Sequence, residues 1–396
     1  MKISLIIPSR NNLKYLKWAY TAIRKNQEDH LVEICIADDM SSDGTWEWCQ
    51  QILNEGDTHF KCIRNEGPTR LGHTILYDRL INEVAGHDIC MIYHADMYLC
   101  PRALDAIEKY IKPKTIVSLT RIEPPLHPDG PEKVLADWGI ETENFDEPKF
   151  LEWFNHSKPF KGHITTEGIF APWAFYKSDF QEIGGHDPLY APQSKEDSDI
   201  FNRFQLNEVK FVQTWEGYVY HMTCRGSRFN PVLTTPGTNS TEWETQNIKS
   251  TRNFIRKWGH FVKHDSYMKP IIPPRYLVGF YITHCSLDLL NALEPWCTTV
   301  YVENTDNLIE HYIAIEQPNT SINLQKKLCN RDAVHMNLID VLVRIDGNRF
   351  SNEDFHCIQQ LSEIIQSNNE IGSFELGNLK IEIKALTQYQ KQLIKL

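Results

Sequence analysis

Short apolar runs alternate with amphipathic segments along roughly the first hundred residues of the chain. Brief apolar runs, which are typical of buried strands, lie at 3–7, 33–37, 60–63 and 88–93. Segments with apolar residues near helical spacing lie between and after these runs, at 13–25, 45–53, 76–84 and 101–110. This alternation predicts an α/β fold in which helices flank a mostly parallel sheet.

Polar residues follow the predicted strands at their carboxyl ends. The clusters are Pro8-Ser9-Arg10-Asn11, Asp38-Asp39, Asn65-Glu66-Gly67 and His94-Ala95-Asp96. Open α/β sheets bind ligands outside the carboxyl ends of their strands, which lie at one edge of the sheet. The four clusters therefore predict one common site.

The pattern continues beyond an expected insertion. A strand is predicted at 115–121, an insertion rich in Pro, Asp and Glu follows from 123 to about 155, and a second organised block lies at 168–221. An amphipathic helix is predicted at 241–258. The apolar residues on or near one face of that helix are Ile248, Phe254, Ile255 and Trp258.

A group of prolines marks a boundary at Pro270, Pro273 and Pro274. Beyond it, strand-like runs lie at 276–282, 298–302, 338–345 and 379–383. A helix is predicted at 352–367, with Ser351 and Asp354 as a capping box. We therefore predict a first domain at 1–265 and a smaller α/β or α+β module at 266–396.

Charge and cysteine content exclude several classes of protein. The 396-residue chain has a formal net charge of -11, which disfavours nucleic-acid binding because that binding depends on phosphate neutralisation. Its 10 cysteines include no CxxC pair, so neither a zinc framework nor a dense disulfide scaffold is expected, and a reducing cytoplasm fits best. The run at 3–7 is too short for a signal peptide, and no stretch approaches the ~20 apolar residues that span a bilayer.

The segment 34–45 carries the most specific signal. Its predicted strand ends at Asp38 and Asp39. A turn rich in Ser, Asp and Gly follows and leads into a helix. Either carboxylate could accept a hydrogen bond from a base N–H or a ribose hydroxyl. The alternative is that both acids only form the turn.

Together with Pro8-Ser9-Arg10, this segment resembles the nucleotide-binding half of the family 2 glycosyltransferases, which have the GT-A fold. The resemblance extends over about residues 1–225 as an ordered series of motifs. The residues that it implies at the nucleotide pocket are Pro8, Ser9, Arg10, Asp38, Asp39 and Arg70.

His94-Ala95-Asp96 occupies the position of the family's DxD motif, which contacts the donor ribose and a divalent metal ion. Asp96 matches the metal-binding acid. His94 replaces the first acid, and it could contact the ribose, bind the metal or pack. His221, after a predicted strand, matches a further metal ligand of many GT-A enzymes, although a strand-end histidine can also be an ordinary hydrogen-bonded residue. These ligands suit Mn²⁺ or Mg²⁺.

A second match lies at 180–199, which resembles the family's GGxD turn, here with Gly185, and its ED motif at a helix start. The resemblance implies that Asp197 is the general base, with Glu196 as the alternative. The structural alternative is that these acids only stabilise the helix N-terminus. In a helix, Asp199 would pair with Arg203.

Three further residues complete the implied donor site. Trp173 lies in a region that borders the donor and acceptor sugars, although core packing is the alternative for any tryptophan. Arg225 and Arg228 could neutralise the leaving diphosphate, and a solvated surface loop is their alternative.

The sequence therefore predicts inverting transfer of a sugar from a nucleoside diphosphate to an acceptor hydroxyl of a glycan, lipid or protein. A UDP-sugar is the leading donor, with GDP- and TDP-sugars as alternatives. The module at 266–396 is expected to recognise the acceptor, mediate homo-oligomerisation or brace the first domain. Competing functions are a non-catalytic sugar-nucleotide or glycan-binding protein, a nucleotidyltransferase, or a structural partner protein.

Overall fold

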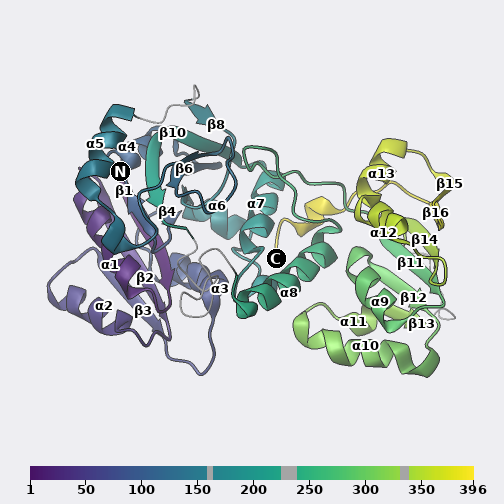
Figure 1. Ribbon diagram of the computed structural model, residues 1–396. Coiled ribbons are helices and arrows are strands. Elements are labelled where there is room, and N and C mark those ends of the chain that lie inside the picture. The colour runs from purple at the N-terminus through teal and green to yellow at the C-terminus, as the bar shows by residue number, and fades with distance from the viewer. Residues whose placement is uncertain (158–163, 224–238, 331–338) are drawn as a thin grey trace. The chain divides into compact units, whose positions relative to one another are not determined.

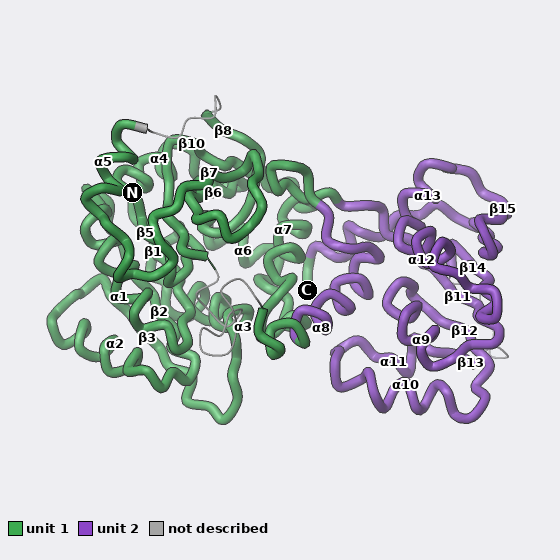
Figure 2. Tube along the Cα trace, in the orientation of Figure 1, with its two compact units in different colours: residues 1–245, 264–271, 395–396 green, residues 246–263, 272–394 purple. Residues whose placement is uncertain are grey.

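The computed structural model describes residues 1–157, 164–223, 239–330 and 339–396 (Figure 1). The chain forms two compact units (Figure 2). Unit 1 comprises Met1–Thr245, His264–Ile271 and Lys395–Leu396, and unit 2 comprises Gln246–Lys263 and Ile272–Ile394. The units interleave around residue 265, and the division into functional domains at 1–265 and 266–396 stays a prediction.

The first part of unit 1 confirms the predicted strand–helix alternation. Its elements are β1 (Lys2–Ser9), α1 (Leu13–Lys25), β2 (Leu31–Asp39), α2 (Thr45–Asn54), β3 (Phe60–Asn65), α3 (Gly72–Arg79), β4 (Ile89–Ile92), α4 (Ala103–Tyr110) and β6 (Thr115–Glu123). Helix α3 begins four residues before the predicted start at Leu76 and runs on as a π-helical turn, Leu80–Val84.

The remaining elements of unit 1 include short strands and three longer helices. They are β5 (Met97–Leu99), β7 (Lys133–Leu135), α5 (Glu147–Ser157), β8 (Thr165–Thr166), β9 (Trp173–Tyr176), α6 (Lys177–Glu182), α7 (Glu196–Leu206), β10 (Lys210–His221) and α8 (Thr241–Trp258), of which α8 continues into unit 2. The expected insertion is packed against the sheet, because Phe150 and Phe154 of α5 are buried with Tyr218 and Tyr220 of β10.

The strands of unit 1 form one large sheet in the order β3-β2-β1-β4-β9-β6-β10-β5, with β7 and β8 paired at β6 and β10. Strands β1 to β4 pair in parallel, as do β6 and β10, whereas β9 and β5 are antiparallel to their neighbours. The apolar residues of β1 are almost completely buried, as expected for a strand covered on both faces. The mixed α/β architecture with a mostly parallel central sheet confirms the predicted fold class.

The parallel register brings the predicted polar clusters to one edge of the sheet. Ser9 at the end of β1 pairs with Asp38 of β2, and Asp39 pairs with Asn65 of β3. These residues lie far apart in the sequence. Their proximity therefore follows from the sheet topology alone.

Unit 2 has its own sheet, in the order β13-β12-β11-β14-β16-β15. Strands β11 to β14 are parallel and the last two are antiparallel, which confirms a second, smaller α/β sheet. Its elements are β11 (Val278–Thr283), α9 (Leu287–Leu293), β12 (Thr299–Val302), α10 (Leu308–Glu316), α11 (Leu324–Lys327), β13 (Leu328–Asn330), β14 (Val341–Asp346), α12 (Asn352–Gln359), α13 (Leu361–Asn368), β15 (Gly372–Leu376) and β16 (Leu379–Ile383).

Two predictions about helices need correction. The expected single helix at 352–367 is two helices, because Gln360 leaves helical geometry at φ -110 and ψ 11. The predicted capping box of Ser351 and Asp354 is confirmed at the start of α12. In α8, Phe254 and Trp258 are buried as expected, but Ile248 is 62% exposed and does not belong to the buried face. Among the described residues, no helix has the length and apolar character needed to cross a membrane.

Candidate active site

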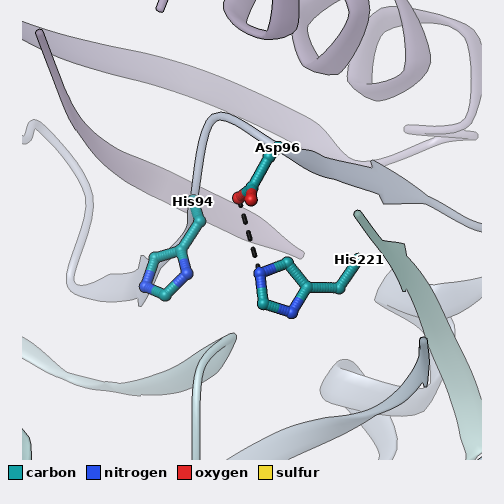
Figure 3. A group of neighbouring side chains, drawn as sticks. All are labelled: His94, Asp96 and His221. Carbon is teal, nitrogen blue, oxygen red and sulfur yellow. Dashed lines mark ion pairs between the residues drawn. The ribbon is translucent and has the colours of Figure 1, made fainter. Parts of the chain in front are cut away.

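A cluster of three potential metal ligands lies where β5 meets β10 (Figure 3). Strand β5 pairs with the end of β10 so that His221 faces Met97, the residue after Asp96. The Nε2 atom of His221 lies 3.5 Å from Oδ1 of Asp96, and the rings of His94 and His221 are 5.7 Å apart. The ligand atoms of all three residues lie within 4.8 Å of one another, so one metal ion could contact them together.

The protonation of the two imidazoles differs sharply. Burial lowers the pKa of His94 to about 4, with the neighbouring His221 as the next cause, so His94 is neutral and has a free lone pair at physiological pH. Burial also disfavours the charge on His221, but Asp96 and Glu123 outweigh it and raise the pKa of His221 to about 9. The donor set of one carboxylate and two imidazoles fits a divalent transition metal ion.

Glu123 is a residue of this site that the sequence did not reveal. Its Oε1 lies 2.9 Å from Nδ1 of His221, on the side of the ring away from Asp96. The Glu123 side chain is buried between Arg121, at 3.3 Å, and Lys133, at 3.2 Å. The predicted strand ended at Arg121, and the only available signal was a charged residue two positions further along an apolar run.

The paired aspartates at the end of β2 are both buried, and both accept hydrogen bonds from other residues of the protein. Oδ1 of Asp39 accepts hydrogen bonds from the Asn65 side chain and from Leu71 N, and Oδ2 accepts one from Gly72 N at 2.9 Å. Asp38 accepts a hydrogen bond from Ser41 N and lies 3.2 Å from the Arg64 guanidinium. These contacts suit the turn-forming interpretation. A nucleotide contact of Asp38 or Asp39 stays a prediction.

Other residues expected at the nucleotide lie at the same edge. The hydroxyl of Ser9 is buried and has no hydrogen-bond partner among the residues that the structure describes. Pro8 is half-buried and Arg10 is exposed. Arg70 is held by Gln193 at 3.1 Å, and burial together with the nearby charge of Arg10 lowers its pKa. Two guanidinium groups therefore lie near the end of β1.

Glu196 and Asp197 open helix α7 and differ in their environment. Glu196 is 5% exposed, and its Oε1 lies 2.7 Å from Nε2 of His73 in α3. Burial opposes ionisation of Glu196, but the charge and hydrogen bond of His73 prevail and lower its pKa. Burial and the neighbouring Glu196 raise the pKa of Asp197 to about 6. The different surroundings therefore make Asp197 a stronger base than Glu196.

The GGxD turn is held by α3 and α7. Gly185 has φ +76, and a Cβ atom there would lie 2.0 Å from Oδ2 of Asp78, so only glycine admits this carboxylate. Asp78 in turn bonds both the backbone N–H and the ring of His186, at 2.7 Å for the ring. Arg203 pairs with Asp199 at 2.8 Å, as the i, i+4 spacing predicted. A donor contact of Gly185 stays a prediction.

Trp173 lies in the core. It is 0% exposed and packs against Phe175, Phe201 and Phe204. Stacking of this ring on a sugar would require it to be uncovered, so the packing interpretation fits the structure. Arg225 and Arg228 lie outside the described residues.

The metal-ligand cluster and the carboxylate pair both lie close enough to α3 to influence its side chains. His73 of α3 bonds Glu196, and its charge also lowers the pKa of His94. Burial raises the pKa of Tyr77, with contributions from Asp197, Glu196 and Asp96. The start of α3 also donates its Gly72 N–H to Asp39. Three of the predicted motifs, which contain Asp39, Asp96 and Asp197, therefore lie near one helix of unit 1. Ala95 is buried between His94 and Asp96, and a donor contact of Ala95 stays a prediction.

Solved structures with some similarity to this chain include GalNAc-T7, PcManGT and TarS. GalNAc-T7 with UDP, GalNAc and Mn²⁺ has 15% identity and a TM-score of 0.47, over 67% of this chain and 49% of that one. The mannosyltransferase PcManGT from Pyrobaculum calidifontis, in complex with GDP-Man and Mn²⁺, has 14% identity and a TM-score of 0.42, over 64% and 63%. S. aureus TarS 1–349 has 15% identity and a TM-score of 0.40, over 65% and 80%. The chain thus spans about half the length of the first of these structures.

No curated protein matches the chain. A family model does: the one described as glycosyl transferase family 2 matches residues 4–169. The matched stretch includes the polar ends of β1, β2, β3 and β4, with His94 and Asp96, and it ends before α7. Residues 4–169 are therefore a glycosyltransferase domain of family 2.

Proposed function

We propose that this protein transfers a sugar from a nucleoside-diphosphate sugar to an acceptor hydroxyl, with inversion at the anomeric carbon. The observation that carries the proposal is the convergence of two groups on α3. One is the His94, Asp96 and His221 cluster, and the other is the carboxylate pair Glu196 and Asp197. The family 2 match at residues 4–169 includes α3, His94 and Asp96, whereas His221, Glu196 and Asp197 lie after it.

His94, Asp96 and His221 would hold a divalent metal ion, and Mn²⁺ suits them better than Mg²⁺. Mg²⁺ strongly prefers oxygen ligands, whereas imidazole nitrogens suit first-row transition metals. When bound, such an ion neutralises negative charge on the diphosphate of the donor. The exposed Arg10 and the neighbouring Arg70 lie at the same sheet edge and add positive charge there.

Asp197 would act as the general base. Its pKa of about 6 leaves it ionised at neutral pH and makes it a better proton acceptor than Glu196, whose charge is held by His73. The acceptor oxygen forms a bond to the anomeric carbon, its proton passes to Asp197, and the carbon–oxygen bond to the diphosphate breaks. One such displacement inverts the anomeric configuration.

A UDP-sugar is the leading donor, with GDP- and TDP-sugars as alternatives, and a saccharide or other hydroxyl compound is the acceptor. Unit 2 would contribute acceptor recognition or self-association. The experiment is to titrate the full chain with UDP-, GDP- and TDP-sugars in Mn²⁺. Thermal unfolding reports binding, since a ligand at 100 times its Kd adds ~2.7 kcal/mol, and released nucleoside diphosphate reports turnover.

We expect at least one donor to stabilise the protein and to be consumed, and Asp96→Ala to abolish both effects. Stabilisation without release of nucleoside diphosphate, even with saccharide acceptors present, would favour the non-catalytic binding protein. Pyrophosphate formed from a nucleoside triphosphate and a sugar phosphate would favour the nucleotidyltransferase. If no donor either binds or reacts, the proposal is wrong.

A further inference from the structure

The buried carboxylate of Glu123 contacts His221, one of the three potential metal ligands. Glu123 is the last residue of β6, and β6 runs parallel to β10 with Ile122 facing Tyr220. The next residues along the two strands are Glu123 and His221, so the pairing itself sets them side by side. Strand β5 then places Asp96 on the other side of His221.

Each ring nitrogen of His221 faces its own carboxylate. Nδ1 lies 2.9 Å from Oε1 of Glu123, and Nε2 lies 3.5 Å from Oδ1 of Asp96. An imidazole binds a metal only through a nitrogen that carries no proton, and the neutral ring keeps one proton. If Glu123 accepts that proton in a hydrogen bond from Nδ1, the lone pair is left on Nε2, which faces Asp96 (Figure 3).

We infer that Glu123 is a positioning residue of the metal centre, which fixes the tautomer and the orientation of His221. This inference rests on the proposed metal-dependent function. Outer carboxylates that bond a ligating histidine typically change metal affinity by 10–100-fold when they are removed.

The surroundings of Glu123 keep its carboxylate charged and in place. Arg121 Nη1 lies 3.3 Å from Oε1, and Lys133 Nζ lies 3.2 Å from Oε2. Arg121 itself packs over the ring of Phe170, with the guanidinium carbon 4.2 Å from the ring centre. A buried carboxylate is tolerated only when it is paired in this way. The alternative explanation is that Glu123 only balances the positive charges of Arg121 and Lys133.

A matched pair of variants separates these explanations. Glu123→Gln keeps the size of the side chain, but its amide can donate to Nδ1 and so force the proton onto Nε2. Glu132→Gln is the control, because Glu132 is also buried and lies 3.9 Å from Arg121. We expect Mn²⁺ titrated calorimetrically into the nucleotide-free full chain to bind Glu123→Gln 10–100-fold more weakly than wild type, and Glu132→Gln to stay within about twofold.

A spectroscopic readout tests the tautomer directly. In protein loaded with diamagnetic Zn²⁺, ¹H–¹⁵N spectra of the histidine side chains should show the proton of His221 on Nδ1 in wild type. The signal should be absent or displaced in Glu123→Gln. A role limited to charge balance would leave this signal unchanged.

Folded Glu123→Gln that binds Mn²⁺ as wild type does would overturn the inference, while the metal site itself would stand. If wild type binds no Mn²⁺ and Asp96→Ala changes nothing, the proposed metal function fails instead. Should Glu123→Gln not fold, Glu123→Asp replaces it, since it keeps the charge near Arg121 and Lys133 but withdraws the carboxylate from Nδ1. Weaker Mn²⁺ binding by that variant supports the inference, and unchanged binding overturns it.

Discussion

The imidazole of His73 lies 2.7 Å from the carboxylate of Glu196, which joins the start of α3 to the start of α7. The charge of His73 stabilises the ionised form of Glu196, and the ionised Glu196 in turn raises the pKa of its neighbour Asp197. One contact between two helices thereby determines which of two adjacent acids is the stronger base.

The acidic limb of the pH–rate profile should report Asp197. Its pKa is raised to about 6 by burial and by Glu196, so its basic form is lost as the pH falls through about 6. We expect kcat/KM to be constant above that pH and to fall about tenfold per pH unit below it. The measurement is the rate of nucleoside diphosphate release at subsaturating donor and acceptor from pH 4.5 to 8.

His73→Gln provides the matched variant, since glutamine can still donate a hydrogen bond to Glu196 but carries no charge. The charge of His73 also acts directly on Asp197 and lowers its pKa, so its removal should move the acidic limb to higher pH as long as Glu196 stays ionised. If the acidic limb of the pH–rate profile lies at the same pH in His73→Gln as in wild type, then Asp197 is not the titrating group or His73 does not influence its pKa.

Replacing Asp197 should lower the rate of turnover without a comparable loss of donor binding. Asp197→Asn removes the proposed proton acceptor and should lower kcat by about 10²–10⁴-fold, while donor affinity measured by calorimetry stays within a few-fold. Glu196→Gln should keep more activity, because Glu196 already has His73 as its partner. A larger loss of kcat for Glu196→Gln than for Asp197→Asn would reverse the assignment of the base.

We expect the metal preference to depend on His94. With two imidazoles and one carboxylate, wild type should be activated by Mn²⁺ more strongly than by Mg²⁺ at equal concentration. His94→Asp replaces one potential nitrogen ligand with an oxygen ligand. This substitution should reduce the difference between activation by Mn²⁺ and activation by Mg²⁺. Activity measured over a titration of each metal checks both statements. A Mn²⁺-to-Mg²⁺ ratio that does not change in the variant would place His94 outside the metal centre.

Much of unit 1 was predictable because its strands are buried on both faces. The continuous apolar run of β1 and the two acids at the end of β2 indicated the sheet edge before any contact was known. Asp96 and His221 were predicted as ligands, yet their pairing depends on the antiparallel strand β5, which is only three residues long.

Glu123 and His73 were missed for a shared reason, since both lie at element ends. The strand that carries Glu123 continues past Arg121, and the helix that carries His73 begins before the apolar positions used to locate it. Element ends are set by tertiary contacts such as the Asp39 bonds to Leu71 and Gly72, and these leave no periodic pattern in the sequence. The break at Gln360 likewise occurs without glycine or proline.

The buried pair of Asp199 and Arg203 should be the main stabilising contact of α7. Both side chains are 0% exposed, and the Arg203 guanidinium also donates to the carbonyl oxygens of Ile183, at 2.9 Å, and Gly185, at 2.6 Å. Arg203→Ala leaves a buried carboxylate and two carbonyl groups without this partner, and we expect it to lower the free energy of unfolding by about 3–5 kcal/mol. Arg79→Ala is the control, because Arg79 and Glu83 have the same i, i+4 spacing but their side chains are 35% and 56% exposed, and exposed helix pairs contribute about 0.3–0.5 kcal/mol.

Urea unfolding followed by tryptophan fluorescence measures both variants, and the transition that involves unit 1 is the one to compare because two units can unfold separately. Since Arg203 ties α7 to the turn at Gly185, its loss should also disturb the position of Glu196 and Asp197 and lower kcat, even at temperatures where the variant stays folded. Equal destabilisation by Arg203→Ala and Arg79→Ala would mean that burial of the pair adds nothing, and the helix would then have to be held in place by the packing of Ile200 and Phe204.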